Sequence, residues 1–253
     1  HRAFAARPGR RRALAGAGLT SPGETPRPPA APPAMGSTEM PAPASRTVST
    51  AAVVLRSVPY GEADRIVTLL TESFGKVAVM ARGARRSRRR FGGALEPYAL
   101  LEADVGLGRG EIGRLAQARV VRAFPGVLTS LSRMGLAAAG LELVREATPE
   151  REPPDRRLLP TIVRFFELVE GAADDPLRLA FTLRALALLG LSPNLESCGR
   201  CGRPAPPSKA ALFDPARGSL VCRTCGGGPL KLSGALRRRL AAAGGGRWDE
   251  VAA

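Results

Sequence analysis

The segment CGRCGRPAPPSKAALFDPARGSLVCRTC, residues 198–225, decides much of the fold. It contains the four cysteines of the chain as two Cys-x-x-Cys pairs with twenty residues between them, at Cys198, Cys201, Cys222 and Cys225. Two thiolates separated by two residues reach one ion from a single tight turn, and a second such turn completes a tetrahedral shell. The spacing therefore predicts a structural zinc site with four thiolate ligands and no open position.

The residues beside the cysteines fit a zinc site. Glycines permit the tight turns, and arginines offset the negative charge of a zinc ion with four thiolates. They are Gly199, Arg200, Gly202, Arg203, Arg223 and Gly226. Two disulfides or a redox-active Cys-x-x-Cys are the alternatives, and the doubled motif favours zinc. Reduced cysteines of this kind are typical of the cytosol, so we expect a cytoplasmic protein.

Charge and composition point to a polyanionic partner. The 253 residues include 44% hydrophobic residues, enough for one large or two small domains, and the formal net charge is +16. Such a balance favours nucleic acid over a membrane surface. A generally arginine-rich proteome would also raise the net charge, so local clustering of arginine is the stronger indicator. No apolar stretch approaches the roughly 18 residues of a membrane span, so no membrane partner is expected.

Residues 1–46 are predicted to be a disordered tail rich in proline and alanine. A segment of this composition buries too little surface to offset the entropy lost on ordering. The chain begins with His1, and we expect the natural start at Met35 or Met40. The run Arg10-Arg11-Arg12 offers a targeting alternative, but the apolar part after it is short.

Residues 47–126 are expected to form an oligonucleotide-binding (OB-fold) barrel. Short strand-like runs alternate with turn signals at Pro59-Tyr60-Gly61 and Phe74-Gly75-Lys76. The five expected strands are residues 51–57, 66–70, 77–81, 98–105 and 115–124. Five short strands in one segment are typical of a small closed barrel.

The densest positive charge lies between the third and fourth expected strands. Six arginines fall within nine positions and are followed by an aromatic residue, at Arg82, Arg85, Arg86, Arg88, Arg89, Arg90 and Phe91. Arginine reaches phosphates through a fixed fork of donors, and an aromatic ring can stack on a base. We therefore predict that these residues bind nucleic acid. The alternative is a flexible basic loop that only remains solvated.

Residues 127–253 are expected to form a helical domain, into which the zinc-binding segment, residues 194–228, is inserted. Apolar residues recur at helical spacing in four stretches, 131–144, 160–169, 175–188 and 229–243, the last with Arg237-Arg238-Arg239. The predicted fold class is therefore α+β, with a five-stranded OB-fold barrel followed by an all-helical domain that carries the four-cysteine segment.

Motifs for catalysis are weak or missing. The sequence GRGEIG at 108–113 matches Gly-x-Gly-x-x-Gly, but no helix or acidic residue follows at the required distance, so a β-hairpin turn is the better interpretation. We find no phosphate-binding loop of the Walker type, and His1 is the only histidine. An ATP-driven motor, a nuclease and other catalytic functions are therefore disfavoured.

The chain resembles the bacterial RecO family of DNA repair and recombination mediators. The resemblance lies in VLRSVPYGEADRIVTLLT at 54–71, GKV at 75–77, RGARR at 82–86, and LALLGLSPNL at 186–195 leading into Cys198. It covers roughly residues 47–232. It implies an N-terminal OB-fold barrel, a helical domain and a zinc-binding segment. The first 40 or so residues have no counterpart, and the C-terminal end is shorter than is usual.

The resemblance also implies a function in the repair of DNA damage. A member of this family binds single- and double-stranded DNA, anneals complementary strands, and works with RecR. Together they help load the RecA recombinase onto DNA coated by single-stranded DNA-binding protein, in the cytoplasm at the nucleoid. Two other classes remain open: a zinc-ribbon RNA-binding or transcription-associated protein, and a nucleic-acid-modifying enzyme with structural zinc.

Overall fold

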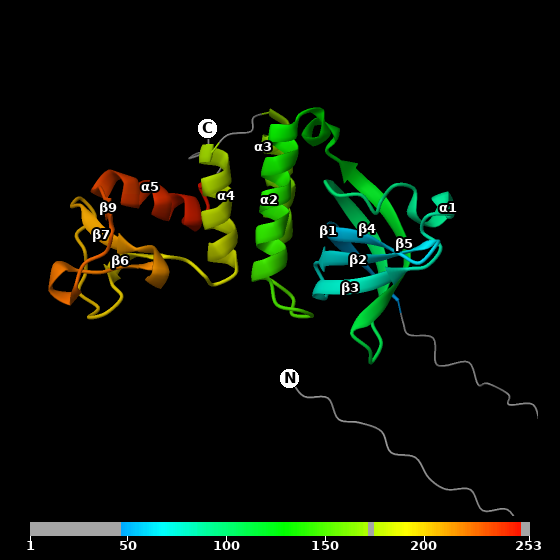
Figure 1. The fold of residues 1–253 in the computed structure, drawn as a ribbon, viewed down its shortest axis with the longest axis horizontal. Helices are drawn as coiled ribbons and strands as arrows, with labels where there is room; N and C mark the ends of the chain where they lie inside the picture. Colours follow the sequence, from blue (N-terminus) through cyan, green and yellow to red (C-terminus); the bar gives the residue numbers. More distant parts are fainter. Residues whose placement is uncertain (1–46, 172–174, 249–253) are drawn as a thin grey trace, which may run out of the picture. The chain divides into compact units, whose positions relative to one another are not determined.

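The computed structural model describes residues 47–171 and 175–248, apart from the side chain of Arg88. The predicted tail at 1–46, with its start-site and targeting interpretations, lies outside the described residues. Within the described part, a β-barrel is followed by helices and then by a small sheet that contains the cysteines (Figure 1). No described helix has both the length and the apolar character needed to cross a bilayer.

Five strands close the barrel in the order β1-β2-β3-β5-β4. The strands are β1 (Val48–Tyr60), β2 (Asp64–Thr71), β3 (Gly75–Ala81), β4 (Ala99–Gly106) and β5 (Ile112–Ala123), and a short helix, α1 (Arg88–Phe91), lies between β3 and β4. Neighbouring strands are antiparallel except β3 and β5, whose parallel pairing joins 78–80 to 112–114. The predicted five-stranded barrel is confirmed, and 108–113 lies in the β4–β5 hairpin.

The long strand β1 contributes to two cores. Ala52 and Val54 are buried with the barrel interior, whereas Val53 and Leu55 are buried against the helices. Successive side chains of a strand point to opposite faces, so one apolar run can serve both sides. Each fully buried valine or leucine contributes about 1.5–3 kcal/mol. The barrel and the helices therefore share β1 as a common wall.

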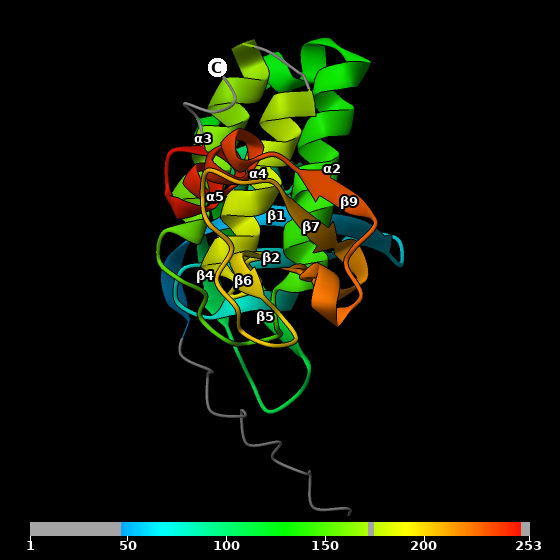
Figure 2. The ribbon, with the colours of Figure 1, turned by 90° about the vertical axis from the view of Figure 1, so that its left-hand side faces the viewer.

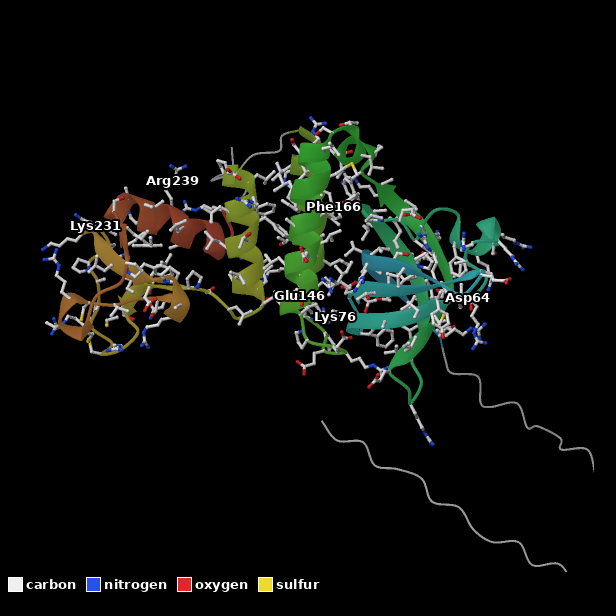
Figure 3. The ribbon with its side chains drawn as sticks, viewed as in Figure 1. Asp64, Lys76, Glu146, Phe166, Lys231 and Arg239 are labelled. Carbon is white, nitrogen blue, oxygen red and sulfur yellow. The ribbon has the colours of Figure 1, made fainter. Side chains whose placement is uncertain are left out.

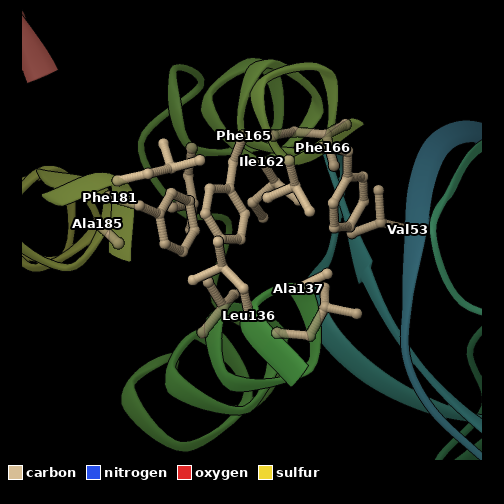
Figure 4. Packing of buried hydrophobic residues seen from close by; sticks show 14 of the residues in the cluster. Val53, Leu136, Ala137, Ile162, Phe165, Phe166, Phe181 and Ala185 are labelled. Atoms are coloured by element: carbon tan, nitrogen blue, oxygen red, sulfur yellow. The ribbon is translucent and has the colours of Figure 1, made fainter. Parts of the chain in front are cut away.

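Three helices follow the 3-10 helix η1 (Pro125–Thr129): α2 (Leu131–Ala147), α3 (Leu158–Gly171) and α4 (Asp175–Leu188). The helix α2 contacts β1, and α4 packs on α2 and α3 (Figure 1). The ring of Phe165 stacks on that of Phe181 at 3.9 Å between centroids (Figure 4). A side chain at Gly140 of α2 would place its Cβ 2.4 Å from the Phe165 ring. Glycine at 140 thus lets α2 approach the aromatic core closely.

The last turn of α2 and the loop between α2 and α3 also contact the barrel. The Lys76 ammonium donates to the Arg145 carbonyl at 2.8 Å, and the Arg151 N–H donates to the Lys76 carbonyl at 2.8 Å. Figure 3 shows Lys76 beside Glu146, where β3 meets α2. Gly75 has φ +67°, and a Cβ there would lie 1.8 Å from the Glu152 carbonyl oxygen. This turn therefore requires glycine.

The cysteine-containing segment forms a four-stranded sheet in the order β6-β8-β7-β9, of which β6, β7 and β9 are labelled in Figure 2. Its elements are β6 (Asn194–Cys198), β7 (Ala211–Asp214), η2 (Pro215–Arg217), β8 (Ser219–Leu220), η3 (Arg223–Cys225) and β9 (Leu230–Leu232). The helix α5 (Gly234–Gly245) follows and packs on α4, where the Arg184 guanidinium donates to the Gly244 carbonyl at 3.0 Å.

The expectation of one helix over 229–243 needs a correction. Residues 230–232 pair with β7 as strand β9, and the helix begins only after Ser233, whose Oγ accepts from the Leu236 N–H at 3.1 Å. A serine at this position is a preferred N-cap. Leu230 and Leu232 fit a helical spacing as well as an alternating one, so periodicity alone did not separate the two.

Candidate nucleic-acid interface and metal centre

The basic loop, defined here as residues 82–91, is anchored to the β1–β2 hairpin. The Gly83 N–H donates to Asp64 Oδ1 at 2.7 Å, and the Arg85 N–H donates to the Ala63 carbonyl at 3.0 Å. The Ser87 N–H donates to the Gly83 carbonyl at 2.9 Å, and Gly83 has φ +65°. Figure 3 shows Asp64 at this end of the barrel. Backbone hydrogen bonds thus fix the base of the loop.

The described arginine side chains of the basic loop face solvent, at Arg82, Arg85, Arg86, Arg89 and Arg90. Arg86 lies 3.7 Å from the carboxylate of Glu62, and both side chains are highly exposed. Such exposed pairs contribute little to stability and are readily exchanged for another anion. Arg82 and Arg89 have no ion-pair partner in the described part of the chain. The loop therefore presents cations that a phosphate backbone can contact.

The structure corrects the prediction that Phe91 stacks on a base. Phe91 is only 2% exposed and packs in the barrel core with Ala94 and Leu95. The guanidinium carbon of Arg90 lies 5.2 Å from the centre of the Phe91 ring. Because α1 turns Phe91 inward, the ring closes one end of the barrel and supports Arg90 instead of facing a ligand.

Sequence reasoning missed Tyr60, which the structure places beside the basic loop. Tyr60 is 55% exposed and is the cross-strand partner of Asp64, whose carboxylate holds Gly83. It is the most exposed aromatic side chain among residues 47–171 and 175–248. The sequence signal was its position at a hairpin tip next to Gly61, where a large side chain is seldom covered.

The arginines of β5 differ in their availability. Arg119 forms an ion pair with Glu102, and Arg122 forms one with Glu167 and lies over the Phe124 ring. Hydrogen bonds from Arg164 and Arg122 lower the pKa of the Glu167 carboxyl. By contrast, no described residue pairs with Arg114, which is exposed. Of these strand arginines, Arg114 is the one that faces solvent without a partner.

The four cysteines meet in one cluster. Their sulfur atoms all lie within 4.8 Å of one another, and Cys201 Sγ is 3.7 Å from Cys222 Sγ. A tetrahedral zinc ion with sulfur ligands at about 2.3 Å places its sulfurs about 3.8 Å apart. All four thiols are free in the structure, so no disulfide competes for them. Among the described residues, this is the only group of potential metal ligands that comes together.

The backbone around the cluster favours the thiolate form of Cys198. N–H groups of Cys222, Cys201 and Arg200 lower the pKa of the Cys198 thiol to about 6. Hydrogen bonds with the thiols of Cys222 and Cys201 raise the pKa of Cys225 to about 12. Four thiolates so close together repel one another, so holding all of them deprotonated requires a cation at the centre. The donor set and geometry therefore fit a metal ion.

A buried arginine fixes the cysteine-containing sheet to α5. Arg237 is 3% exposed, and its guanidinium donates to the carbonyls of Leu195, Ala205, Pro206 and Lys209 at 2.6–3.1 Å. These acceptors lie in the loop that carries the first cysteine pair and in the strand before it. The neighbouring Arg239 is exposed on α5 (Figure 3). Arg237 is thus a structural residue, although the sequence grouped it with two surface arginines.

Comparison with known proteins covers both parts of the chain. Residues 45–124 match the family described as "Recombination protein O N terminal", and residues 128–253 match "Recombination protein O C terminal". The first match covers the barrel and the basic loop, and the second covers the helices and the cysteine cluster.

Individual members of this family are similar to most of the chain. The chain is 43% identical over 183 residues to "DNA repair protein RecO" of Anaeromyxobacter sp. (strain K), which covers 72% of this chain and 71% of the relative. It is 41% identical over 177 residues to the protein of the same name from Pelobacter propionicus, covering 70% and 71%. The Myxococcus xanthus protein of that name is 41% identical over 176 residues, covering 69% and 71%.

Proposed function

The chain belongs to the RecO family of DNA repair proteins, and from this premise we propose that it is a non-catalytic DNA-binding protein of recombinational repair. It binds single- and double-stranded DNA and anneals complementary strands. With RecR it helps load RecA onto DNA coated by single-stranded DNA-binding protein. The observation that carries the DNA-binding part is the basic loop, whose arginines are exposed on a backbone anchored to the barrel.

The physical argument for DNA binding concerns charge and shape. A barrel of this kind with a fixed basic loop offers an electrostatic track for a phosphate backbone. No described side chain of the loop contacts a buried carboxylate, so phosphate binding breaks only weak surface pairs. Contacts of this type position a strand without reading its sequence, which suits a protein that anneals any complementary pair.

We further propose that the four cysteines hold zinc and that the metal is structural. Four thiolates complete a tetrahedral shell, and a closed shell leaves no position for a substrate or for an activated water. The Arg200 guanidinium donates to the Cys225 carbonyl at 3.1 Å and so joins the two turns directly. The metal then stabilises the sheet β6-β8-β7-β9 and takes no part in any reaction.

The basic loop is tested by replacing Arg85, Arg86 and Arg89 together with glutamine. We expect single-stranded DNA affinity to fall at least tenfold at low salt, by the loss of phosphate contacts. The slope of log affinity against log salt should flatten by about 0.7 per lost contact. Salt titrations with fluorescent oligonucleotides measure both, and annealing of complementary oligonucleotides should slow in parallel.

A matched control removes three charges from the helical part, at Arg156, Arg178 and Arg247, which are all exposed. This variant should keep nearly the wild-type salt slope and annealing rate. If the loop variant keeps the wild-type slope of log affinity against log salt, the bound DNA strand does not contact the basic loop. If the wild-type protein binds RNA and not DNA oligonucleotides, the repair function proposed here is wrong.

Tyr60 is predicted to stack on a base of the bound strand, in the position first assigned to Phe91. Tyr60→Ala should weaken binding by about 1–3 kcal/mol, the usual contribution of one stacked base. The salt slope should not change, because stacking releases no counterions. Tyr60→Phe keeps the ring and should bind like wild type. Equal affinity of the alanine variant and wild type in a salt titration would show that Tyr60 faces solvent only.

A further inference from the structure

A pocket opens where β3 and β5 close the barrel. It has a volume of about 610 Å³, and we call it the β3–β5 pocket. Its main side chains are Met80, Arg82, Arg90, Ile112, Arg114 and Leu115. Because β3 and β5 pair over only three residues each, their divergence leaves space beside the basic loop. The volume lies in the range of about 300–1,000 Å³ typical of small-ligand sites.

One wall of the β3–β5 pocket is apolar. Leu115 is buried, Met80 is half-buried, and Ile112 is 48% exposed at the start of β5. Backbone approaches closely at Gly113, where a Cβ would lie 2.7 Å from a Leu107 methyl and 3.0 Å from the Gly106 carbonyl oxygen. Glycine here lets β5 pack closely on Leu107, on the Gly106 backbone and on the buried Val79. Such a wall suits the face of an unpaired base.

The other wall is cationic. Arg82, Arg90 and Arg114 come from the end of β3, from α1 and from β5, and no carboxylate lines the pocket. The Arg90 guanidinium is oriented by the Arg82 carbonyl at 2.8 Å and by Ser87 Oγ at 3.2 Å. Arg82 and Arg114 have no ion-pair partner among the described residues. The guanidinium groups of Arg82 and Arg114 can therefore each donate two parallel hydrogen bonds to a phosphate group.

We propose that the β3–β5 pocket receives one nucleotide of a bound single strand. The base packs on Met80 and Ile112, and Arg82 and Arg114 bind the flanking phosphates. The proposal rests on the DNA-binding function above and deepens it, because Arg82 and Arg90 belong both to the basic loop and to the pocket. A DNA strand bound to the basic loop can thus continue into the pocket and remain next to arginine side chains along the way. Nothing in the lining selects one base, so any base fits.

Two single variants separate the base from the phosphates. Ile112→Ala should weaken binding to labelled oligo-dT several-fold at an unchanged salt slope, because it removes apolar contact only. Arg114→Gln should flatten the slope by about 0.7, the share of one phosphate contact on a single strand. The controls are Val121→Ala and Arg109→Gln, which change exposed residues of β5 and of its hairpin outside the pocket. Both controls should behave like wild type, and thermal melting verifies the fold.

Photocrosslinking then locates the strand. An oligo-dT in which one thymine is replaced by iodouracil should crosslink to the peptide that contains Met80, and Ile112→Ala should reduce the yield. Suppose that both pocket variants bind like their controls while the loop variant of Arg85, Arg86 and Arg89 loses affinity. The pocket proposal is then wrong and the DNA-binding function stands. If neither the pocket variants nor the loop variant loses affinity for the oligonucleotide, both the pocket proposal and the DNA-binding function are wrong.

Discussion

Replacing Cys198 or Cys222 with serine is expected to release the bound metal and to unfold the cysteine-containing segment, residues 194–232. The sheet has short strands, and its largest buried groups are few: Leu195, Cys198, Leu220 and Val221. Metal binding supplies about 10–16 kcal/mol of apparent stability in small zinc-folded peptides, so little else holds such a segment. Elemental analysis should find one zinc per wild-type chain and less than one in either variant.

Hydrogen exchange gives the second measurement for the cysteine variants. Amides of β6 to β9 should lose protection in both, whereas amides of the barrel should keep it, because no buried residue of β6 to β9 belongs to the barrel core. Thr224→Val is the matched control, since its hydroxyl lies 3.0 Å from Cys222 Sγ without being a ligand. This variant should retain zinc. A wild-type protein without metal, whose two cysteine pairs form disulfides, would contradict the prediction.

The clustering of the four cysteines was predictable because its information is local. Each Cys-x-x-Cys turn places its own two sulfurs, and the chain needs only to bring two turns together. The barrel was predictable for a similar reason, since alternating residues such as Val77 and Val79 mark strands directly. The strand boundaries moved by a few residues, because pairing with a neighbour extends a strand beyond its apolar run.

The two aromatic residues beside the basic loop show where sequence reasoning fails. Phe91 follows six arginines, and its neighbours suggested a solvent-facing ring. The barrel needs an apolar group to close its end, and α1 directs Phe91 there. Tyr60 is exposed because a hairpin tip has nothing above it. Burial of a single side chain depends on tertiary packing, which a run of like charges does not encode.

Arg237 is the second case of this kind. A triplet of arginines on a helix normally lies in water, yet α5 turns the first of them toward the cysteine-containing sheet. The five N–H donors of a guanidinium match the five hydrogen bonds that Arg237 makes to four carbonyls. Three of the four acceptors, Ala205, Pro206 and Lys209, belong to a proline-rich loop, where proline removes N–H donors, and this was the available signal.

Arg237→Met is expected to cost about 3 kcal/mol or more of stability, because it leaves several buried carbonyls without a donor. Arg237→Lys should recover little, since one ammonium cannot span four acceptors. Chemical denaturation measures the loss, and hydrogen exchange should show it first in 195–209. The control Arg239→Met removes the same charge from an exposed position of the same helix. It should change stability by no more than about 0.5 kcal/mol.

The effect of Arg237→Met should depend on the metal. Arg237 binds the Leu195 carbonyl, and the Cys198 N–H donates to the Arg203 carbonyl, so the guanidinium and the metal order the same loop. With metal bound, the variant should unfold this loop only in part; after chelation, the wild type and the variant should become alike there. Residues that stabilise one element together are not additive, and a cycle of chelation and mutation measures this coupling. Additive losses would show that Arg237 and the cysteines stabilise separate parts of the segment.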